Sequence, residues 1–313
     1  MVTPEQIRAA HGRIQPYIRR TPLLTLAPED LGFVCALLSL KLEFLQKSGT
    51  FKARGAFNHL LSREVPPAGV CAASGGNHGA AVAMAASQLG VKARIFVPAI
   101  SPPAKMNRIR SFGAELVVGG PQYPEALAAC ERYAAESGAI TVHAYDAWET
   151  MAGQGTVGLE WEEDAAAAGG LDTVLVACGG GGLVGGIAAW FARRVKVVAV
   201  EPAGSCALHA ALAAGGPVDV DVKSVAADSL GARNVFARVH QVSAAYVDHV
   251  ALVPDAAITA AQHELWQKLR VALEPGGATA FAALRSGAYR PERHERVGVL
   301  LCGSNMDPSM LAG

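Results

Sequence analysis

Short apolar runs alternate with longer, alanine-rich segments along most of the chain. The runs lie at residues 69–73, 93–97, 115–118, 173–177, 195–200 and 297–301, and segments of helical length lie at 80–90, 103–112, 124–137 and 184–194. The runs lack the polar alternation of a strand with one exposed face, which is typical of parallel sheets covered by helices on both faces. The pattern therefore predicts an α/β fold.

The alternation falls into two series along the chain. One covers about residues 69–143, the other begins near Thr173, and the stretch from Tyr145 to Asp164 lies between them. Two series of strands and helices predict two sheets. We therefore expect a domain boundary near Asp146.

Composition and charge narrow the class of ligand. Among 313 residues, 27 Lys and Arg balance 27 Asp and Glu, so the formal net charge is zero. Without a net field to concentrate polyanions, small molecules are favoured over nucleic acid or membranes as partners. The six cysteines form no CxxC motif or Cys/His cluster. No apolar leader precedes the first predicted helix, which Thr3 is expected to cap. We expect a cytoplasmic protein without disulfides or a zinc site.

Four consecutive glycines, Gly179–Gly182, follow the apolar run at 173–177 and precede a predicted helix. Their backbone N–H groups are free to converge on an anion, and the helix adds the positive end of its dipole. A tight strand-to-helix turn would also use glycine, although it rarely needs four. The loop therefore predicts a phosphate site.

Part of this run also matches the dinucleotide-binding pattern. Gly180, Gly182 and Gly185 have the spacing G-x-G-x-x-G, and Glu201 closes the next predicted strand about 20 residues further on. An NAD-dependent oxidoreductase is therefore an alternative of a different class. A glycine pattern is weak by itself, and this one leaves the lysine and asparagine segments unexplained.

A lysine begins the alanine-rich apolar segment at residues 52–57. Lys52 does not lie on a charged face of the predicted helix. A lysine in apolar surroundings loses its proton easily and becomes a nucleophile that can form a Schiff base. The alternative is a lysine at the edge of the helix whose amine extends into water.

Two further strand ends carry polar side chains. Ser74, Asn77 and the glycines between them offer a hydroxyl, an amide and backbone N–H groups, which suit a carboxylate and one polar ring substituent. Ser74 or Asn77 would also serve as an ordinary helix cap. Cys302 follows the run at 297–301 with a thiol, although a buried cysteine usually packs as a small apolar residue.

In this order, the four segments resemble the pyridoxal-phosphate-dependent serine/threonine dehydratases of the tryptophan-synthase-β-like fold (fold type II), a group that includes serine racemase. The resemblance runs from Arg20-Thr21-Pro22-Leu23 to Cys302-Gly303-Ser304-Asn305. It implies pyridoxal 5'-phosphate as the cofactor and a homodimer. It also implies two domains, each an open, mostly parallel sheet flanked by helices: a small domain at 66–146 and a large cofactor-binding domain at 1–65 plus 147–313.

The resemblance implies roles for single residues by motif position. Lys52 is similar to the catalytic lysine that holds the cofactor as a Schiff base, and Phe51 to the residue beside the cofactor. The implied cofactor-binding residues are Lys52, Phe51, Asn77 at the ring hydroxyl, Gly179, Gly180, Gly181 and Gly182 at the phosphate, and Cys302 at the pyridine nitrogen. The implied substrate-binding residues are Ser74, Gly75, Gly76 and His78, which resemble the loop for the substrate carboxylate.

The chain departs from the family pattern at several positions. Gly75 stands where serine racemases have a serine, the acid/base of the second face, so racemisation is not expected. Glu201 matches the first ligand of the family's divalent-cation site, but Ala207 replaces the second carboxylate, so we expect no metal. The side-chain pocket of the substrate is expected at residues 228–233, where Arg233 would either bind a second carboxylate or lie on the surface.

We therefore expect a lyase that removes water from a β-hydroxy amino acid, giving a 2-oxo acid and ammonia. L-threonine and L-serine are the default substrates. Within the same cofactor class, the alternatives are an amino-acid (serine) racemase and a dehydratase of hydroxyaspartate or phenylserine.

Overall fold

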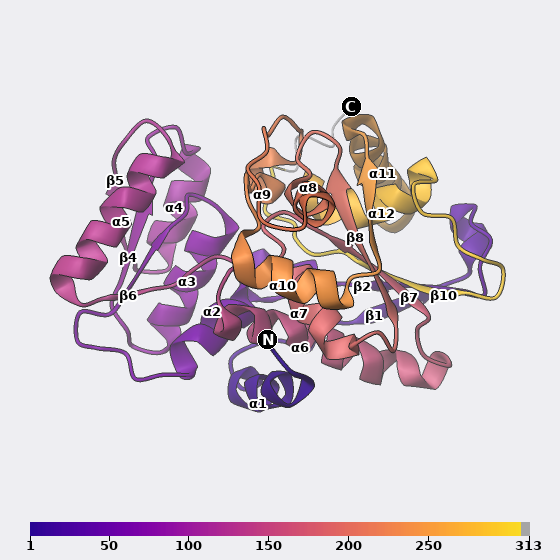
Figure 1. The fold of residues 1–313 in the computed structure, drawn as a ribbon, viewed down its shortest axis with the longest axis horizontal. Helices are drawn as coiled ribbons and strands as arrows, with labels where there is room; N and C mark the ends of the chain where they lie inside the picture. Colours follow the sequence, from indigo (N-terminus) through magenta and orange to yellow (C-terminus); the bar gives the residue numbers. More distant parts are fainter. Residues whose placement is uncertain (308–313) are drawn as a thin grey trace.

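The computed structural model describes residues 1–307, which form two sheets side by side (Figure 1). The large sheet has the strand order β1-β2-β10-β7-β8-β9, and the small sheet has the order β5-β4-β3-β6. Neighbouring strands are parallel except for β1 and β2. The predicted α/β fold with two mostly parallel sheets is confirmed.

The large sheet contains β1 (Leu23–Leu26), β2 (Leu37–Lys41), β7 (Thr173–Ala177), β8 (Lys196–Pro202), β9 (His249–Val253) and β10 (Arg296–Leu300). The small sheet contains β3 (Val70–Ala73), β4 (Ala93–Val97), β5 (Glu115–Val118) and β6 (Ile140–Thr141). Leu175 at the centre of the large sheet pairs with Val198 and Val299 and is fully buried. Its strand needs no polar alternation because helices cover both faces. The exact domain boundaries stay a prediction.

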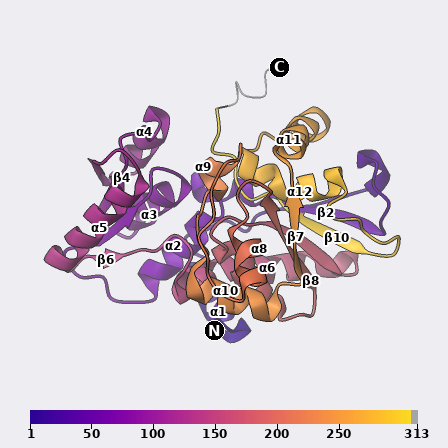
Figure 2. The ribbon, with the colours of Figure 1, turned by 45° about the horizontal axis from the view of Figure 1, so that its top comes forward.

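Helices cover both faces of each sheet (Figures 1 and 2). The small sheet packs against α3 (Asn77–Gln88) and α4 (Pro103–Ser111) on one face and α5 (Tyr123–Ser137) on the other. The large sheet packs against α6 (Trp148–Ala165) and α7 (Gly182–Phe191) on one face and α12 (Pro275–Ser286) on the other, where α11 (Asp255–Leu269) packs against α12. The remaining helices are α1 (Pro4–Ile14), α2 (Lys52–Leu61), α8 (Ala207–Ala214), α9 (Ala227–Leu230) and α10 (Phe236–Tyr246), with short 3-10 turns at Pro28–Leu31, Glu43–Leu45, Lys47–Gly49 and Ala166–Ala168.

Helix α2 joins the two parts of the molecule. Its apolar residues Ala53, Ala56 and Phe57 belong to the buried core beneath the small sheet, while the helix also packs against α6 on the large sheet. Each sheet therefore contributes to fixing α2, whose first residue is Lys52.

Two helices begin earlier than the apolar pattern predicts. Helix α3 begins at Asn77 rather than near Ala80, and α7 begins at Gly182 rather than near Val184. The first turn of a helix has N–H groups without partners inside the helix, so polar and glycine residues occur there and the apolar pattern starts one turn later. Both early starts lie in the predicted ligand loops. No helix among residues 1–307 is long and apolar enough to cross a membrane.

Candidate active site

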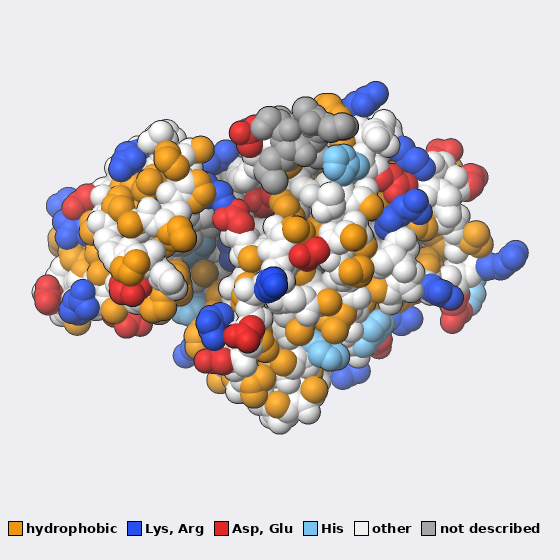
Figure 3. All heavy atoms as spheres, turned by 90° about the horizontal axis from the view of Figure 1, so that it is seen from above, with side chains coloured by type: hydrophobic (Ala, Val, Ile, Leu, Met, Phe, Trp, Pro, Cys, Tyr) orange, Lys and Arg blue, Asp and Glu red, His pale blue; other side chains and the backbone are white. Residues whose placement is uncertain are grey.

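Two strand-to-helix loops from different sheets face each other across a cleft. Ser74–Gly76 connects β3 to α3, and Cys178–Gly181 connects β7 to α7. A Cβ on Gly76 would lie 3.9 Å from the carbonyl oxygen of Asp228, which belongs to the large part of the molecule. Figure 3 shows the hollow between the two parts, with histidine side chains visible in it. The carboxyl ends of parallel strands are where α/β folds bind ligands.

The glycine loop, Gly179–Gly182, presents backbone donors. Within residues 1–307, the N–H groups of Gly179, Gly180 and Gly181 meet no backbone carbonyl. Gly181 has a φ of 80°, a left-handed conformation that favours glycine. Helix α7 follows directly and leaves the N–H groups of its first turn open. The donor set and the helix end fit a phosphate group.

Tyr145 packs against the glycine loop and keeps side chains out of it. A Cβ on Gly180 would lie 2.3 Å from the Tyr145 ring, and a Cβ on Gly182 would lie 2.8 Å from Tyr145 Cα. The Tyr145 hydroxyl donates to the carbonyl of Asn234 at 3.1 Å, and the ring stacks on Phe236 with 5.9 Å between centroids. Tyr145 was predicted only as the start of the segment between the two series, so its contact with the glycine loop is a finding of the structure.

Lys52 extends its amine toward the cleft. Nζ donates to the carbonyl of Ala144 at 2.9 Å and lies 5.1 Å from the centroid of the Phe51 ring. Burial lowers the pKa of Lys52 from 10.5 to about 8, against the opposing influence of Cys302 and Glu274. A larger fraction of this amine is therefore neutral near pH 7 than in an ordinary lysine, which suits a Schiff-base nucleophile.

A buried ion-pair network fixes the first turn of α2. Arg54, fully buried, lies 2.5 Å from Glu43 and 2.7 Å from Glu160, and Lys41 lies 2.7 Å from Asp164 at the edge of the same network. Removing one partner of a buried ion pair costs about 3–5 kcal/mol, because the other charge is left without compensation. The network therefore holds the backbone of Lys52 in place.

Cys302 lies directly behind Phe51. Its carbonyl accepts from the N–H of Phe51 at 3.2 Å, and its thiol donates to the carbonyl of Gly276 at 3.5 Å. Burial raises the pKa of the Cys302 thiol, so the side chain is neutral at physiological pH. The structure thus brings Cys302 within electrostatic reach of Lys52.

Asn77 belongs to a short chain of side-chain hydrogen bonds. Its Nδ2 donates to Glu274 at 2.7 Å, and its Oδ1 accepts from Asn305 at 2.7 Å. Burial raises the pKa of Glu274 to about 7, an effect that the Asn77 hydrogen bond opposes. Neither Glu274 nor Asn305 was predicted to have a role, although each contacts Asn77.

The side chains of the Ser74–Gly76 loop and its neighbours are mostly engaged within the protein. Ser74 Oγ accepts from the N–H of Gly76 at 3.3 Å. His78 is buried, and its Nε2 donates to the carbonyl of Val142 at 2.8 Å. Burial, with the Lys52 charge nearby, lowers the pKa of His78 to about 3, so the ring is neutral. Contact of the His78 side chain with substrate stays a prediction.

Glu201 does not face the cleft. It is fully buried, and its two oxygens accept from the backbone N–H groups of Leu208 and His209 at 2.9 and 2.8 Å. Both oxygens are thus engaged at the start of α8, and neither is free for the ribose that the dinucleotide pattern requires. In the described part of the chain no group of three or more His, Cys, Asp or Glu side chains is arranged to hold a metal ion.

Arg233 lies on the surface. Its side chain is 67% exposed, and its guanidinium lies 3.8 Å from the fully exposed Asp221. Ser229, in the same predicted pocket segment, lies against Gly276, because a Cβ on that glycine would meet Ser229 Oγ at 2.2 Å. The structure therefore supports the surface interpretation of Arg233.

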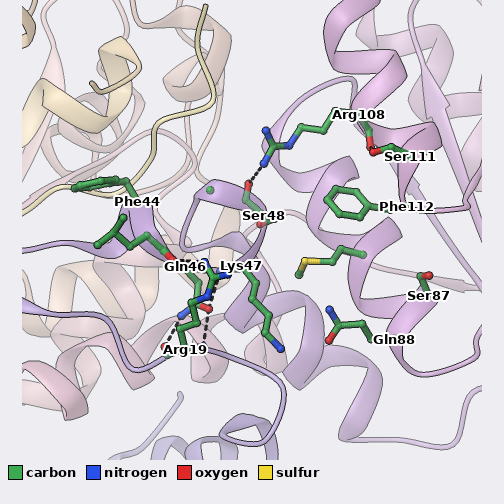
Figure 4. Close-up of a pocket in the computed structure, with 13 residues that line it drawn as sticks. Arg19, Phe44, Gln46, Lys47, Ser48, Ser87, Gln88, Arg108, Ser111 and Phe112 are labelled. Carbon is green, nitrogen blue, oxygen red and sulfur yellow. Dashed lines mark hydrogen bonds between the residues drawn. The ribbon is translucent and has the colours of Figure 1, made fainter. Parts of the chain in front are cut away.

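A separate cavity of about 600 Å³ opens beside the Lys47–Gly49 turn (Figure 4). Arg19, Lys47 and Arg108 contribute positive charge to its lining, and Arg108 donates to the carbonyl of Ser48 at 2.9 Å. Lys52, Asn77 and the glycine loop are absent from the residues that line it. This cavity is therefore distinct from the place where the predicted site residues converge.

A lysine with a lowered pKa beside a loop of free N–H groups, between two parallel sheets, defines an α/β enzyme with a phosphate-bearing cofactor. Residues 14–303 match the family model described as pyridoxal-phosphate dependent enzyme. The chain therefore belongs to this family, and pyridoxal phosphate is its cofactor.

Related proteins cover nearly the whole chain. The chain is 37% identical to phenylserine dehydratase of Ralstonia pickettii, over 98% of this chain and 94% of that protein. It is 35% identical to L-threonine ammonia-lyase of Geobacter sulfurreducens, over 96% of this chain and 75% of that protein. The structure of maize serine racemase matches with a TM-score of 0.91 and 31% identity, covering 99% of this chain and 96% of that one. The predicted fold type II is confirmed.

Proposed function

We propose that this protein removes water from a β-hydroxy amino acid and releases a 2-oxo acid and ammonia, with L-threonine and L-serine as substrates. The observation that carries the proposal is the amine of Lys52, whose pKa is lowered by burial and which lies within electrostatic reach of Glu274 and His78. The 35% identity to an L-threonine ammonia-lyase supports the same reaction.

In this proposal, Lys52 has two roles. Its neutral amine binds the cofactor covalently and, once freed by the substrate's amino group, takes the proton from Cα. The cofactor, when bound, supplies an electron sink for Cα. Nζ then gives this proton to the hydroxyl on Cβ, which leaves as water, so that Lys52 is neutral again at the end of the step. A positioned base of this kind contributes about 10²–10⁴-fold to the rate.

The remaining cofactor and substrate residues position the reactants. Gly179–Gly182 bind the phosphate through their N–H groups, and Asn77 donates to the ring hydroxyl. Cys302 presents a neutral thiol toward the ring nitrogen, and Phe51 packs beside the ring. Ser74 and the N–H groups of Gly75 and Gly76 bind the substrate carboxylate at the start of α3. Because the reacting carbon lies inside the cleft between the two parts, most water is kept away from it.

The test uses the purified protein with and without added pyridoxal phosphate. We expect a visible absorbance band that borohydride abolishes, and release of a 2-oxo acid and ammonia in equal amounts from L-threonine or L-serine. A protein with the band that released neither product from any β-hydroxy amino acid would contradict the proposal. Light scattering and limited proteolysis would test the proposed homodimer and the proposed boundaries near residues 66 and 146.

An aromatic cluster favours phenylserine as a second candidate substrate. His143 and Tyr145 flank Ala144, whose carbonyl accepts from Lys52, and the rings of His143 and Tyr145 lie 4.9 Å apart. Phe236 stacks on Tyr145 and is 43% exposed. Aromatic pairs contribute about 0.5–1.5 kcal/mol beyond the area they bury, so a phenyl group on Cβ would gain from this cluster.

Phe236→Ala tests this candidate. We expect kcat/KM for phenylserine to fall about 3–10-fold, while kcat/KM for L-threonine stays within about twofold. Trp266→Ala is the matched control, because Trp266 is another partly exposed aromatic residue, 37% exposed on α11. Equal losses for both substrates would assign Phe236 a structural role instead.

A further inference from the structure

The amide of Asn77 takes its orientation from the backbone carbonyl of Ser48, through Asn305. Asn305 Nδ2 donates to the carbonyl oxygen of Ser48 at 2.9 Å and to Asn77 Oδ1 at 2.7 Å. A backbone carbonyl accepts hydrogen bonds and never donates, so the branch of the Asn305 amide that faces Ser48 must be the nitrogen. An NH2 group repels a second NH2 group, so the branch of Asn77 that faces this nitrogen must be the oxygen.

The nitrogen of Asn77 is left with one N–H to spare. Asn77 Nδ2 donates to Glu274 Oε1 at 2.7 Å, which agrees with the orientation that Asn305 sets. An amide nitrogen carries two N–H donors. Within residues 1–307, Glu274 is the one acceptor that Asn77 Nδ2 meets. The second N–H is therefore available to a ligand.

Both partners of Asn77 lie directly against glycine backbone. Glu274 is 4% exposed, and a Cβ on Gly303 would lie 2.2 Å from Glu274 Oε1. Gly49 has a φ of 72°, and a Cβ there would lie 2.4 Å from Asn305 Oδ1. The N–H of Ser304 donates to the carbonyl of Gly49 at 3.1 Å, which holds this backbone beside residue 305. The glycines permit the close approach, and the two side chains have little room to turn.

The spare N–H lies near the catalytic lysine. The charge of Glu274 acts on the amine of Lys52, whose pKa it raises against the effect of burial, and Asn77 is hydrogen-bonded to that carboxylate. In pyridoxal phosphate, the ring hydroxyl is on the carbon next to the one that carries the aldehyde. A donor to this hydroxyl must therefore lie close to the lysine that binds the aldehyde, and Asn77 meets this condition.

We propose that Asn305 and Glu274 are positioning residues that hold the Asn77 amide so that its spare N–H donates to the ring hydroxyl of the cofactor. The inference rests on the proposed function, because it requires the role given there to Asn77. The reversed amide would place two acceptors together at Glu274 and two NH2 groups together at Asn305, so both partners oppose it. Asn77 begins α3 beside the small sheet, whereas Glu274 and Asn305 belong to the large part. The amide is therefore oriented where the two parts meet.

The test compares two cofactors in binding rather than in turnover. Equilibrium dialysis of folded protein would give the Kd of pyridoxal phosphate and that of 3-deoxypyridoxal phosphate, which lacks the ring hydroxyl. The ratio of the two Kd values measures what the hydroxyl contributes, and a general loosening of the site changes both values together. The parent should prefer pyridoxal phosphate, and Asn77→Ala should lower this preference about 3–10-fold.

Asn305→Asp reverses the polarity of the chain without changing its size. The new oxygen would attract Asn77 Nδ2, so the amide should turn over and the preference should fall about 3–10-fold. Asn305→Ala, which removes the donor and adds no charge, should lower the preference at least about twofold and serves if Asn305→Asp does not fold. Glu274→Gln keeps an oxygen that accepts from Asn77, so its preference should stay within about twofold. Asn107→Asp is the matched control, because Asn107 is an exposed asparagine on α4.

The outcomes separate this inference from the proposed function. An unchanged preference in Asn77→Ala would contradict the proposed contact between Asn77 and the ring hydroxyl. A lower preference in Asn77→Ala, with the parental preference in Asn305→Asp and Asn305→Ala, would overturn the positioning role of Asn305 alone. A loss in Glu274→Gln as large as that in Asn305→Asp would overturn the role of Glu274 as an acceptor. The dehydratase reaction is tested independently, by release of 2-oxo acid and ammonia from L-threonine.

Discussion

The two loops that face the cleft differ in how firmly they are packed. In the glycine loop, a Cβ on Gly179 or Gly182 would lie 2.8 Å from neighbouring backbone or side-chain atoms, and a Cβ on Gly180 or Gly181 only 2.3 Å away. In the Ser74–Gly76 loop, a Cβ on Gly75 would lie 2.2 Å from Ser101 Oγ, but a Cβ on Gly76 would meet nothing nearer than 3.9 Å. The glycine loop is therefore enclosed along its whole length, while the Ser74–Gly76 loop is open at Gly76.

This difference suits two ligands with different residence times. A cofactor phosphate stays bound through many turnovers, so an enclosed loop with fixed N–H groups costs no reorganisation in each cycle. A substrate carboxylate must enter and leave each time, which requires space beside its loop. Among the polar contacts from this side to the large part is an exposed one, the ion pair between Lys105 and Asp228, whose carboxylate is 58% exposed.

The largest expected effect comes from the residue that serves both ligands. Lys52→Ala should lower ammonia release at least about 10³-fold, because it removes both the cofactor's covalent anchor and the base for Cα. Lys92→Ala, an exposed lysine before β4, is the control and should leave turnover unchanged. Near-normal ammonia release by Lys52→Ala would contradict the assignment of Lys52.

The enclosed loop should not tolerate a side chain. Gly180→Val should weaken cofactor binding about 10–100-fold, because its Cβ would overlap the Tyr145 ring and displace the N–H groups. Gly185→Ala is the matched control from the same segment, since its nearest contact would be Met151 Sδ at 3.5 Å. Both affinities follow from absorbance titration of folded protein with pyridoxal phosphate. If Gly180→Val and Gly185→Ala bound pyridoxal phosphate equally well, the glycine loop would not be the enclosed one of the two.

The parts of the site that the sequence predicted are local in the chain. The glycine loop and the Lys52 segment could be predicted because each carries its chemistry within a few consecutive residues next to a strand or helix. The contact between Asn77 and Glu274 joins residues 197 positions apart, and no local pattern signals it. The packing of Ser101 against Gly75 was missed for the same reason, because the two residues meet only through the pairing of β3 with β4.

Strand and helix types followed from periodicity, whereas helix starts did not. The runs at 93–97, 115–118 and 173–177 match β4, β5 and β7 at both ends. Helices α3 and α7 begin in the polar or glycine residues of the loops, where hydrophobic periodicity carries no signal. In both cases the misplaced end is the one that faces the proposed ligand.

Behind the enclosed loop, Glu201 should make stability depend on pH. Burial raises its pKa from 4.5 to about 7, beside Cys178 at the start of the loop. Because the folded-state pKa is raised, its contribution is most favourable below pH 4.5 and is lost as pH rises through about 7. The free energy of unfolding should fall by about 3 kcal/mol from this group across that window.

Glu201→Gln should flatten this pH dependence, measured as urea unfolding at pH 4.5, 6 and 7.5. Glu274, whose pKa burial also raises to about 7, contributes in the same window, so the variant should lose about half of the combined slope. The absolute stability of Glu201→Gln also falls, since a Gln side chain cannot accept from both N–H groups. If the free energy of unfolding of Glu201→Gln depended on pH as strongly as that of the parent, folding would not raise the pKa of Glu201.

The smallest effect is expected at the open loop, where Asp228→Asn breaks the ion pair between α4 and α9. Its carboxylate is 58% exposed, and exposed ion pairs contribute about 0–1 kcal/mol because water and salt screen them. The free energy of unfolding should therefore fall by less than about 1 kcal/mol, and the difference should shrink further in about 1 M salt.

Glu115→Gln is the matched control, because Glu115 is also 58% exposed and pairs with Arg94 inside the small sheet alone. A loss of more than about 3 kcal/mol in Asp228→Asn, but not in Glu115→Gln, would mean that this pair holds the two parts together. The open loop would then be as firmly fixed as the glycine loop, and its openness could not explain how substrate enters.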